Sequence, residues 1–289
     1  MTAIDRARFV GGSAAALGAA GATAAGAQTA PAFGHPHPPI VPETDPAIAT
    51  QTIRLQRPDA TIGAYVAMPK IVTPTTPGVV LTVHIWGADA TLRDLARRYA
   101  KEGYIAVLPG LFDRYSPPSG DGSTDLAGFS AIAKQMYAAN TQTGDLLAAH
   151  DWIRSKAARS KIGLYGNCMG GGIVLQAIAG NSNYGAASVF YGYVRADRKA
   201  TQPPPPEAFA WADTVTTPVV GSYAANDNGI APEDLEATYG RFKAPHDLKT
   251  YPGTSHGFFD DTRASYDAAA STDAWARTLA WFGKYLKAT

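Results

Sequence analysis

The sequence predicts an α/β fold with a mostly parallel central sheet and helices on both faces. Residues 78–86, "GVVLTVHIW", form an apolar run rich in β-branched residues, which is typical of a parallel strand buried on both faces. Runs of this kind alternate with helical stretches along the chain, as a sheet covered on both faces requires. The chain has 289 residues, 46% of them hydrophobic, and no internal repeat. These observations predict one domain of about 250 residues.

Strands and helices are expected in a definite order. Residues 61–68 alternate in polarity like a half-exposed strand, and residues 91–103 form an amphipathic helix that ends at Gly103. Further strands are expected at 104–110, 161–166, 186–192, 217–224 and 248–253. Further helices are expected at 125–139, 142–156, 169–180, 231–242 and 272–286. Residues 201–208, "TQPPPPEA", are expected to form a surface loop.

The first residues have the layout of a secretory signal. Arg6 and Arg8 give a basic start, an Ala/Gly run follows, and residues 25–27 read Ala-Gly-Ala, like an A-x-A cleavage site. The segment is similar to a bacterial twin-arginine leader, with Ala7 separating the arginines. Residues 1–27 are therefore predicted to be a signal peptide that directs export, to the periplasm. The alternative is a disordered Ala/Gly-rich tail.

A proline-rich stretch follows the leader. We expect residues 28–50 to form an extended linker and residues 51–289 to form a single domain. His35 and His37 fall short of a metal-ligand set, so we expect a solvated linker there and no metal or organic cofactor. No segment has enough consecutive apolar residues to span a membrane.

The charge balance and the cysteine count limit the function classes. A formal net charge of +1 gives no electrostatic reason to expect nucleic acid as a partner. A single cysteine excludes an intramolecular disulfide.

That one cysteine stands in the pattern Gly166-Asn167-Cys168-Met169-Gly170. The pattern fits G-x-nucleophile-x-G between a strand and a helix, where glycines let the two elements approach each other closely. The helix N-terminus would also favour a thiolate. A phosphate-binding loop is disfavoured because no Lys-Ser/Thr pair follows the glycines. A packed core cysteine remains an alternative, but it does not explain the flanking glycines.

A nucleophile needs a base, and the base needs an orienting carboxylate. Asp227 follows one late strand and His256 follows the next, which gives the chain order nucleophile, acid, histidine. Taken alone, Asp227 could form an Asx turn with Gly229, and His256 could be a capped loop histidine. Rival acids occur in the same region: Asp213, Glu233 and Asp234.

From about residue 60 onward the chain resembles the dienelactone hydrolase (carboxymethylenebutenolidase) family. The resemblance rests on "GNCMGG" at 166–171, "HGF" at 256–258 and "GYIAVLPGL" at 103–111. It implies the α/β-hydrolase fold and hydrolysis of lactones or small carboxylic esters through an acyl-thioester. Two alternatives stay open on the same scaffold: an isomerase or acyltransferase, and a non-catalytic binding protein.

The resemblance also implies roles for particular residues. Cys168 would be the nucleophile, His256 the base and Asp227 its orienting acid. The backbone N–H groups of Ile85 and Met169 would form the oxyanion hole.

The chain departs from the family at residues near the expected site. His84 stands where the family usually has a glutamate that engages the thiol. We hypothesise that His84 supports the thiolate as a cationic neighbour; the alternative is a strand-end histidine bonded to main chain. The arginines that bind the substrate carboxylate in the family are missing, since Asp260 follows the "HGFF" motif. Arg114 and Arg195 are candidate substitutes.

Three aromatic residues are candidates for the substrate pocket: Tyr191, Phe258 and Trp86. Tyr191 matches a family position near the pocket. Core packing is the alternative for all three, and the better supported one for Trp86.

Overall fold

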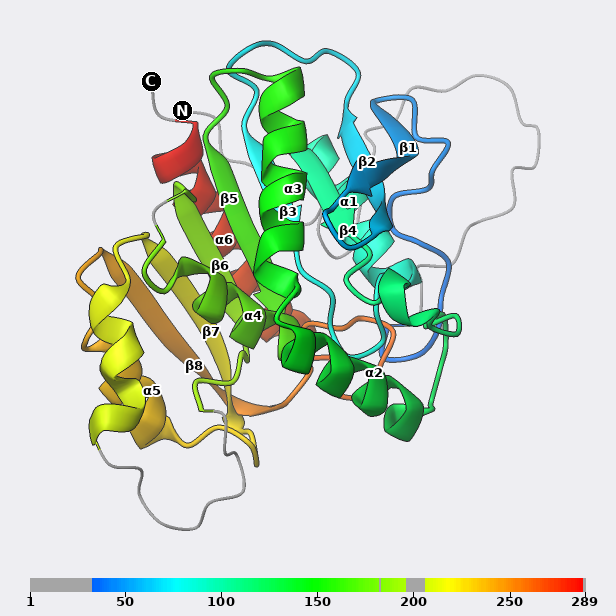
Figure 1. The fold of residues 1–289 in the computed structure, drawn as a ribbon. Coiled ribbons are helices and arrows are strands. Elements are labelled where there is room, and N and C mark those ends of the chain that lie inside the picture. Colours follow the sequence, from blue (N-terminus) through cyan, green and yellow to red (C-terminus); the bar gives the residue numbers. More distant parts are fainter. Residues whose placement is uncertain (1–32, 182, 196–205, 288–289) are drawn as a thin grey trace, which may run out of the picture.

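A computed structural model describes residues 33–181, 183–195 and 206–287. An eight-stranded sheet runs through the domain in the order β1-β2-β4-β3-β5-β6-β7-β8 (Figure 1). β1 and β2 pair antiparallel with each other, β2 pairs antiparallel with β4, and all other neighbours pair in parallel. The expected mostly parallel sheet is therefore confirmed. Residues 1–27, expected to be a signal peptide, and residues 201–205 of the expected loop lie outside the described residues.

The strands are β1 Ile48–Gln56, β2 Thr61–Pro69, β3 Gly78–Leu81, β4 Ile105–Pro109, β5 Ile162–Asn167, β6 Ala186–Phe190, β7 Val219–Asn226 and β8 His246–Ser255. Every residue of β3, β4, β5 and β6 is buried, which explains their continuous apolar runs. β2 alternates between buried and half-buried residues, as its sequence predicts.

Three strands differ from the expected boundaries. The strand expected over 78–86 ends at Leu81, because the chain then turns through the His84–Gly87 bridge. Gly87 adopts φ +73° in this turn, a conformation that suits glycine. The strand expected over 248–253 is longer, from His246 to Ser255, and β1 was not expected as a strand.

Two layers of helices enclose the sheet. α1 and α6 cover one face, and α3, α4 and α5 cover the other (Figure 1). The helices are α1 Ala90–Lys101, α2 Leu126–Ala139, α3 Gln142–Lys156, α4 Met169–Ile178, α5 Pro232–Tyr239 and α6 Ala268–Leu286. Two short 3-10 helices span Asp113–Tyr115 and Pro206–Thr214. The core is the apolar interior between the sheet and these two layers.

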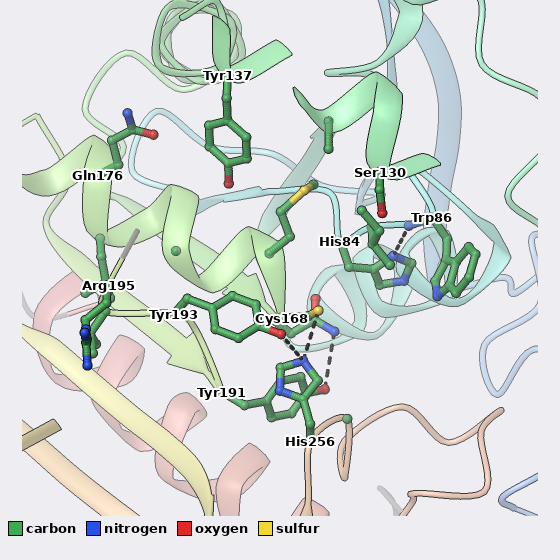
Figure 2. A pocket seen from close by; sticks show the side chains of 18 of the residues that line it. His84, Trp86, Ser130, Tyr137, Cys168, Gln176, Tyr191, Tyr193, Arg195 and His256 are labelled. Atoms are coloured by element: carbon green, nitrogen blue, oxygen red, sulfur yellow. Dashed lines mark hydrogen bonds between the residues drawn. The ribbon is translucent and has the colours of Figure 1, made fainter. Parts of the chain in front are cut away.

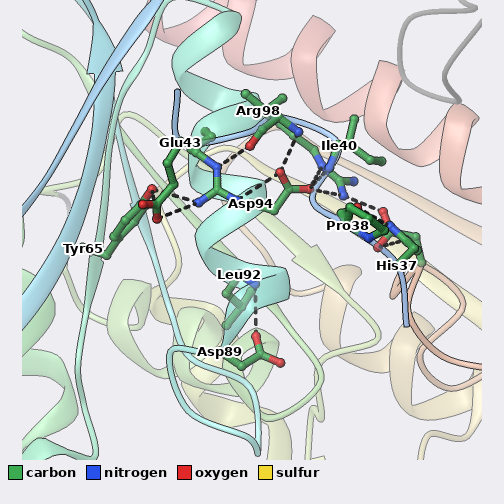
Figure 3. A network of polar contacts seen from close by, with 12 residues as sticks. His37, Pro38, Ile40, Glu43, Tyr65, Asp89, Leu92, Asp94 and Arg98 are labelled. Atoms are coloured by element: carbon green, nitrogen blue, oxygen red, sulfur yellow. Dashed lines mark hydrogen bonds and ion pairs between the residues drawn. The ribbon is translucent and has the colours of Figure 1, made fainter. Parts of the chain in front are cut away.

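Part of the expected linker is packed against the domain, so the expectation of a solvated linker is wrong at Val41 and Ile48, while His35 and most of the other residues up to 47 are exposed. The N–H groups of Ile40 and Val41 donate to the Asp94 carboxylate on α1 (Figure 3). Farther back, the Gly34 N–H donates to the Asp261 carbonyl at 2.8 Å. We call residues 33–47 the N-terminal strap. Val41 is 6% exposed, so the strap contributes to the core.

A buried ion-pair network fastens the strap to α1. Arg98 pairs with both Asp94 and Asp261, and all three side chains are at most 7% exposed. Arg97 donates to the Val41 carbonyl and to the Tyr65 hydroxyl. Asp94 therefore joins the strap, α1 and, through Arg98, the loop that precedes α6. Among the described helices, none is long and apolar enough for a membrane crossing.

Candidate active site

Cys168 occupies a sharp turn between β5 and α4. Its backbone has φ 56° and ψ −126°, a strained conformation for a residue with a side chain. The Cys168 N–H donates to the Phe190 carbonyl at 3.0 Å, which anchors the turn to β6. A Cβ at Gly166 or Gly170 would collide with the Thr82 side chain. A Cβ at Gly166 would also come within 2.3 Å of the Gly170 carbonyl oxygen in α4, so the glycines are required by the close approach of strand and helix, as the motif predicts.

The loops after β7 and β8 bring Asp227 and His256 to the cysteine. The Cys168 Sγ lies 3.1 Å from His256 Nε2, and His256 Nδ1 lies 2.6 Å from Asp227 Oδ2 (Figure 2). The other Asp227 oxygen accepts the Gly229 N–H at 2.9 Å. Asp227 therefore forms the Asx turn considered from the sequence and also contacts the histidine.

The rival acids are engaged elsewhere. Asp213 pairs with Arg241, Asp234 pairs with Arg195, and Glu233 lies in the first turn of α5.

The electrostatics favour an ion pair between sulfur and imidazole. Burial alone would raise the pKa of the Cys168 thiol, but the hydrogen bond to His256, the charges of His256 and His84, and the Met169 N–H together lower it. Burial would likewise lower the pKa of His256, yet its contacts with Asp227 and Cys168 raise it to about 10. Both shifts are in the direction that favours a thiolate beside an imidazolium.

Both residues expected to supply oxyanion donors, Ile85 and Met169, line the same cavity as Cys168. The Met169 N–H begins α4 and forms a hydrogen bond with the thiolate. The Ile85 N–H makes no hydrogen bond within the described ranges, and Ile85 lines the same cavity as Cys168. An unpaired donor beside a nucleophile can stabilise negative charge on a substrate oxygen.

His84 lies at the bottom of this cavity, 3% exposed. Its Nδ1 accepts the Trp86 N–H at 3.2 Å, and its Nε2 lies 3.3 Å from Asp89 Oδ1. Burial would lower the pKa of His84, but the carboxylates of Asp89 and Asp260 raise it. Both ring nitrogens thus face other groups, and neither forms a hydrogen bond with the thiol. Support of the thiolate by His84 stays a prediction.

A cavity of about 1080 Å³ opens above Cys168. One helix, α2, forms much of its wall (Figure 2). The α2 residues that line it are Leu126, Ser130, Ala133, Lys134 and Tyr137. Other lining residues are mostly apolar or aromatic: Trp86, Met169, Leu175, Tyr191, Tyr193, Val194 and Trp211. A cavity of this kind fits an organic molecule with a large apolar part.

Two of the three aromatic residues expected in the pocket line the cavity, and the third does not. Trp86 and Tyr191 line the cavity, but Phe258 does not. Phe258 is 0% exposed and packs on Phe190 and Tyr251, so its assignment to the pocket is wrong. It is a core residue because β8 ends beneath it and α6 closes over it.

The arginine candidates also separate. Arg195 lines the cavity and pairs with Asp234 at 3.1 Å, whereas Arg114 pairs with Asp59 and Asp145 outside it. Within the described ranges, no group of three or more His, Cys, Asp or Glu side chains is arranged to hold a metal.

Sequence reasoning missed two residues beside the site. Arg263 lies over the Trp86 ring at 4.6 Å and within 3.4 Å of Asp260. Tyr193 stacks on the His256 imidazole with ring centroids 5.3 Å apart. Tyr193 lies two residues after Tyr191, and that spacing past a strand end was the available signal.

Comparisons with known proteins agree on one family. Residues 62–286 match the model of the dienelactone hydrolase family. A protein of Escherichia coli K12 named as a carboxymethylenebutenolidase is 30% identical over 254 residues, which cover 85% of this chain and 91% of that protein. A similar protein of Synechocystis is 28% identical and covers 83% of this chain and 98% of its own length.

Solved structures extend the likeness to the fold. A crystal structure from Klebsiella pneumoniae described as a dienelactone hydrolase is 29% identical, with a TM-score of 0.68 over 83% of this chain and all of its own. The dienelactone hydrolase of Anabaena variabilis is 17% identical, with a TM-score of 0.60 over 83% of this chain and 99% of its own. At that identity the likeness shows the fold alone.

Proposed function

The chain belongs to the dienelactone hydrolase family, an α/β-hydrolase family, and from this premise we propose that it hydrolyses lactones or small carboxylic esters through a covalent intermediate on Cys168. The observation that carries the proposal is the 3.1 Å separation of Cys168 Sγ and His256 Nε2 at the base of a cavity. A buried structural cysteine would have neither the imidazole nor the open cavity.

In the first half of the reaction the Cys168 thiolate attacks the carbonyl carbon of the bound ester. The carbonyl oxygen becomes negatively charged and is placed to accept the N–H groups of Met169 and Ile85. The bond to the leaving oxygen then breaks, and the His256 imidazolium donates its Nε2 proton to that oxygen. Asp227 keeps the imidazole oriented through Nδ1. The products are an alcohol and an acyl-thioester.

In the second half water attacks the thioester carbon while neutral His256 accepts the water proton at Nε2. The carbon–sulfur bond breaks, the thiolate returns beside the imidazolium, and the acid leaves. With a lactone, the released alcohol and acid groups belong to one molecule. A thiolate nucleophile suits activated esters and lactones better than amides.

The cavity supports a substrate with a substantial apolar part. Its walls are mainly aromatic and aliphatic, and the two arginines on its lining, Arg195 and Arg263, are each paired with an aspartate. These pairs reduce the attraction for a substrate carboxylate. Lys134 also lines the cavity, so the described lining keeps one cation besides these two pairs, and both uncharged and carboxylate-bearing esters belong in the substrate panel.

Intact-mass spectrometry after rapid mixing with p-nitrophenyl esters and lactones tests the proposal. We expect an added acyl mass on the wild-type protein, none on Cys168→Ala, and stoichiometric release of acid over time. Hydrolysis at an unchanged rate by Cys168→Ala would contradict the proposal. Rearranged or transferred product without acid release would instead support the isomerase or acyltransferase alternative.

A further inference from the structure

A second strained turn near the site follows β6. Tyr191 adopts φ 37°, in the left-handed region, and its N–H donates to the Ser222 carbonyl at 2.8 Å. Gly192 then packs directly on Gly171, at the beginning of α4, where a Cβ has no room. This turn holds the next residue, Tyr193, against the catalytic histidine. Strain of this kind is retained where surrounding packing fixes the backbone and is concentrated at functional sites.

The Tyr193 ring contacts two parts of the candidate site. It lies parallel to the His256 imidazole, with an interplanar angle of 16°. The ring also contacts Gly229, where a Cβ would come within 2.9 Å of Tyr193 Cε1. Gly229 is also the residue whose N–H fixes Asp227. The ring is therefore positioned by the same loop that orients the histidine.

The Tyr193 hydroxyl shares a partner with the nucleophile. It lies 3.5 Å from His256 Nε2, the nitrogen that is 3.1 Å from Cys168 Sγ (Figure 2). That spacing is long for a direct O–H···N hydrogen bond. It leaves no room for a water molecule on the line between the two atoms, but a water beside that line can bind both groups at once, as the third corner of a triangle.

The two halves of the reaction use this arrangement differently. In the resting site the thiolate sulfur is the principal partner of Nε2. After acylation the sulfur is a thioester, which carries no charge and is a weak acceptor. The Tyr193 hydroxyl, 3.5 Å away, is then the remaining polar partner of Nε2 among the described residues.

We propose that Tyr193 is a catalytic residue of deacylation, whose hydroxyl binds the attacking water at His256 Nε2; this inference rests on the function proposed above. The water oxygen forms the new bond to the acyl carbon, and its proton moves to Nε2. The carbon–sulfur bond breaks and its electron pair returns to Sγ. Tyr193 keeps its own proton throughout, so its contribution is to bind and orient the water.

Tyr193→Phe removes the hydroxyl and keeps the stacked ring. Stopped-flow release of p-nitrophenol from p-nitrophenyl butyrate reports acylation, and acid-quenched intact-mass spectrometry reports the acyl-enzyme. We expect acylation within about twofold of wild type and deacylation slowed roughly tenfold to a hundredfold, the effect of losing one hydrogen bond to a charged or reacting group. The acyl-thioester on Cys168 should accumulate accordingly.

Two further measurements separate this role from a structural one. Hydroxylamine attacks thioesters without a general base, so it should restore turnover of Tyr193→Phe toward the wild-type value. Tyr285→Phe, in α6 outside the cavity, should leave both rates unchanged. Tyr193→Leu removes the stack as well and should slow both halves of the reaction.

The possible results discriminate clearly. Equal slowing of acylation and deacylation in Tyr193→Phe, or wild-type rates for both, would overturn the role in deacylation while leaving the thioester mechanism in place. Absence of a Cys168 adduct in both the wild type and Tyr193→Phe, with ester hydrolysis continuing, would refute the proposed function and this inference with it.

Discussion

His84 Nε2 lies 3.3 Å from Asp89 Oδ1, at the bottom of the cavity that contains Cys168. The two side chains are 4% and 5% exposed, so this is a buried histidine–carboxylate pair. A second histidine–carboxylate pair, formed by His256 and Asp227, lies beside the same thiol. Both histidines lower the pKa of Cys168. The sulfur is thus influenced by two imidazoles, of which one forms a hydrogen bond with it.

Replacing His84 should therefore weaken the thiolate without removing the base. Because His84 contributes to the lowered pKa of Cys168, His84→Ala should shift the pH profile of iodoacetamide alkylation to higher pH. His150→Ala, a histidine paired with Asp151 away from the cavity, serves as the control and should not shift the profile. An unchanged profile for His84→Ala would mean that His84 has a structural role only.

Removing the Asp227 charge should narrow the pH range of activity. Asp227 raises the pKa of His256, to about 10, and the His256 charge in turn lowers the pKa of Cys168. In Asp227→Asn the pKa of His256 falls, so the alkaline limb of kcat/KM should move to lower pH. The pKa of Cys168 rises, so the acidic limb should move to higher pH. We expect kcat to fall by roughly 10² to 10⁴. A pH–rate profile whose acidic and alkaline limbs stay at their wild-type pH values would contradict the assignment of Asp227.

The effect of a Gly→Ala substitution on the free energy of unfolding should depend on the space around the added Cβ. Gly170→Ala places a Cβ against Thr82 and the Val83 carbonyl, so we expect a loss of about 1–3 kcal/mol in the free energy of unfolding, together with reduced activity. Gly283→Ala in α6 has nothing within 4 Å and should stabilise by about 0.5–1 kcal/mol. Urea denaturation of both variants measures the difference. Equal effects at the two positions would show that crowding at the turn is not the cause.

The network beneath the strap should be far more sensitive than a surface ion pair. Asp94→Asn removes a buried charge that faces Arg97, Arg98 and the strap amides, and we expect a cost of about 3–5 kcal/mol in unfolding free energy. Asp213→Asn breaks the exposed pair with Arg241 and should cost at most about 1 kcal/mol. Thermal unfolding compares the two. A small loss for Asp94→Asn would mean that the strap is fastened mainly by packing.

We also propose that residues 1–27 direct export of the protein to the periplasm, on the basis of their basic start and Ala-Gly-Ala series. Expression in a Gram-negative host should give a periplasmic product that begins near residue 28, by N-terminal sequencing. Replacement of Arg6 and Arg8 by alanine should retain the protein in the cytoplasm. A full-length cytoplasmic product from the unaltered gene would favour the disordered tail.

The parts of the fold that could be predicted are those where local pattern and tertiary environment agree. Strands β4, β5 and β6 are buried on both faces, so their apolar runs identify them directly. β1 was missed because it lies at the sheet edge, where polar and half-exposed residues obscure the alternation. The strand predicted at 78–86 is too long because the chain stays buried after β3 ends at Leu81. Thr82, Val83 and His84 are buried around the site although they lie outside the strand.

The same limit applies to the candidate site. Cys168, Asp227 and His256 could be identified because each follows a recognisable strand and their order is informative. Tyr193 and Arg263 could not, since their positions depend on how a strained turn and a loop pack in three dimensions. Phe258 was misassigned because an aromatic beside His256 in sequence points into the core instead of the cavity. The strap was misread because proline content describes an extended backbone, and an extended segment can still pack.

The strap also constrains when the protein can complete its fold. Gly34 is bonded to Asp261, near the opposite end of the chain, and His256 lies in the same late segment. During translation the strap leaves the ribosome early, but one of its anchors is made among the last residues. Residues 40–41 can dock on Asp94 as soon as α1 has formed, whereas the contact of Gly34 with Asp261 waits for the same late segment that supplies His256.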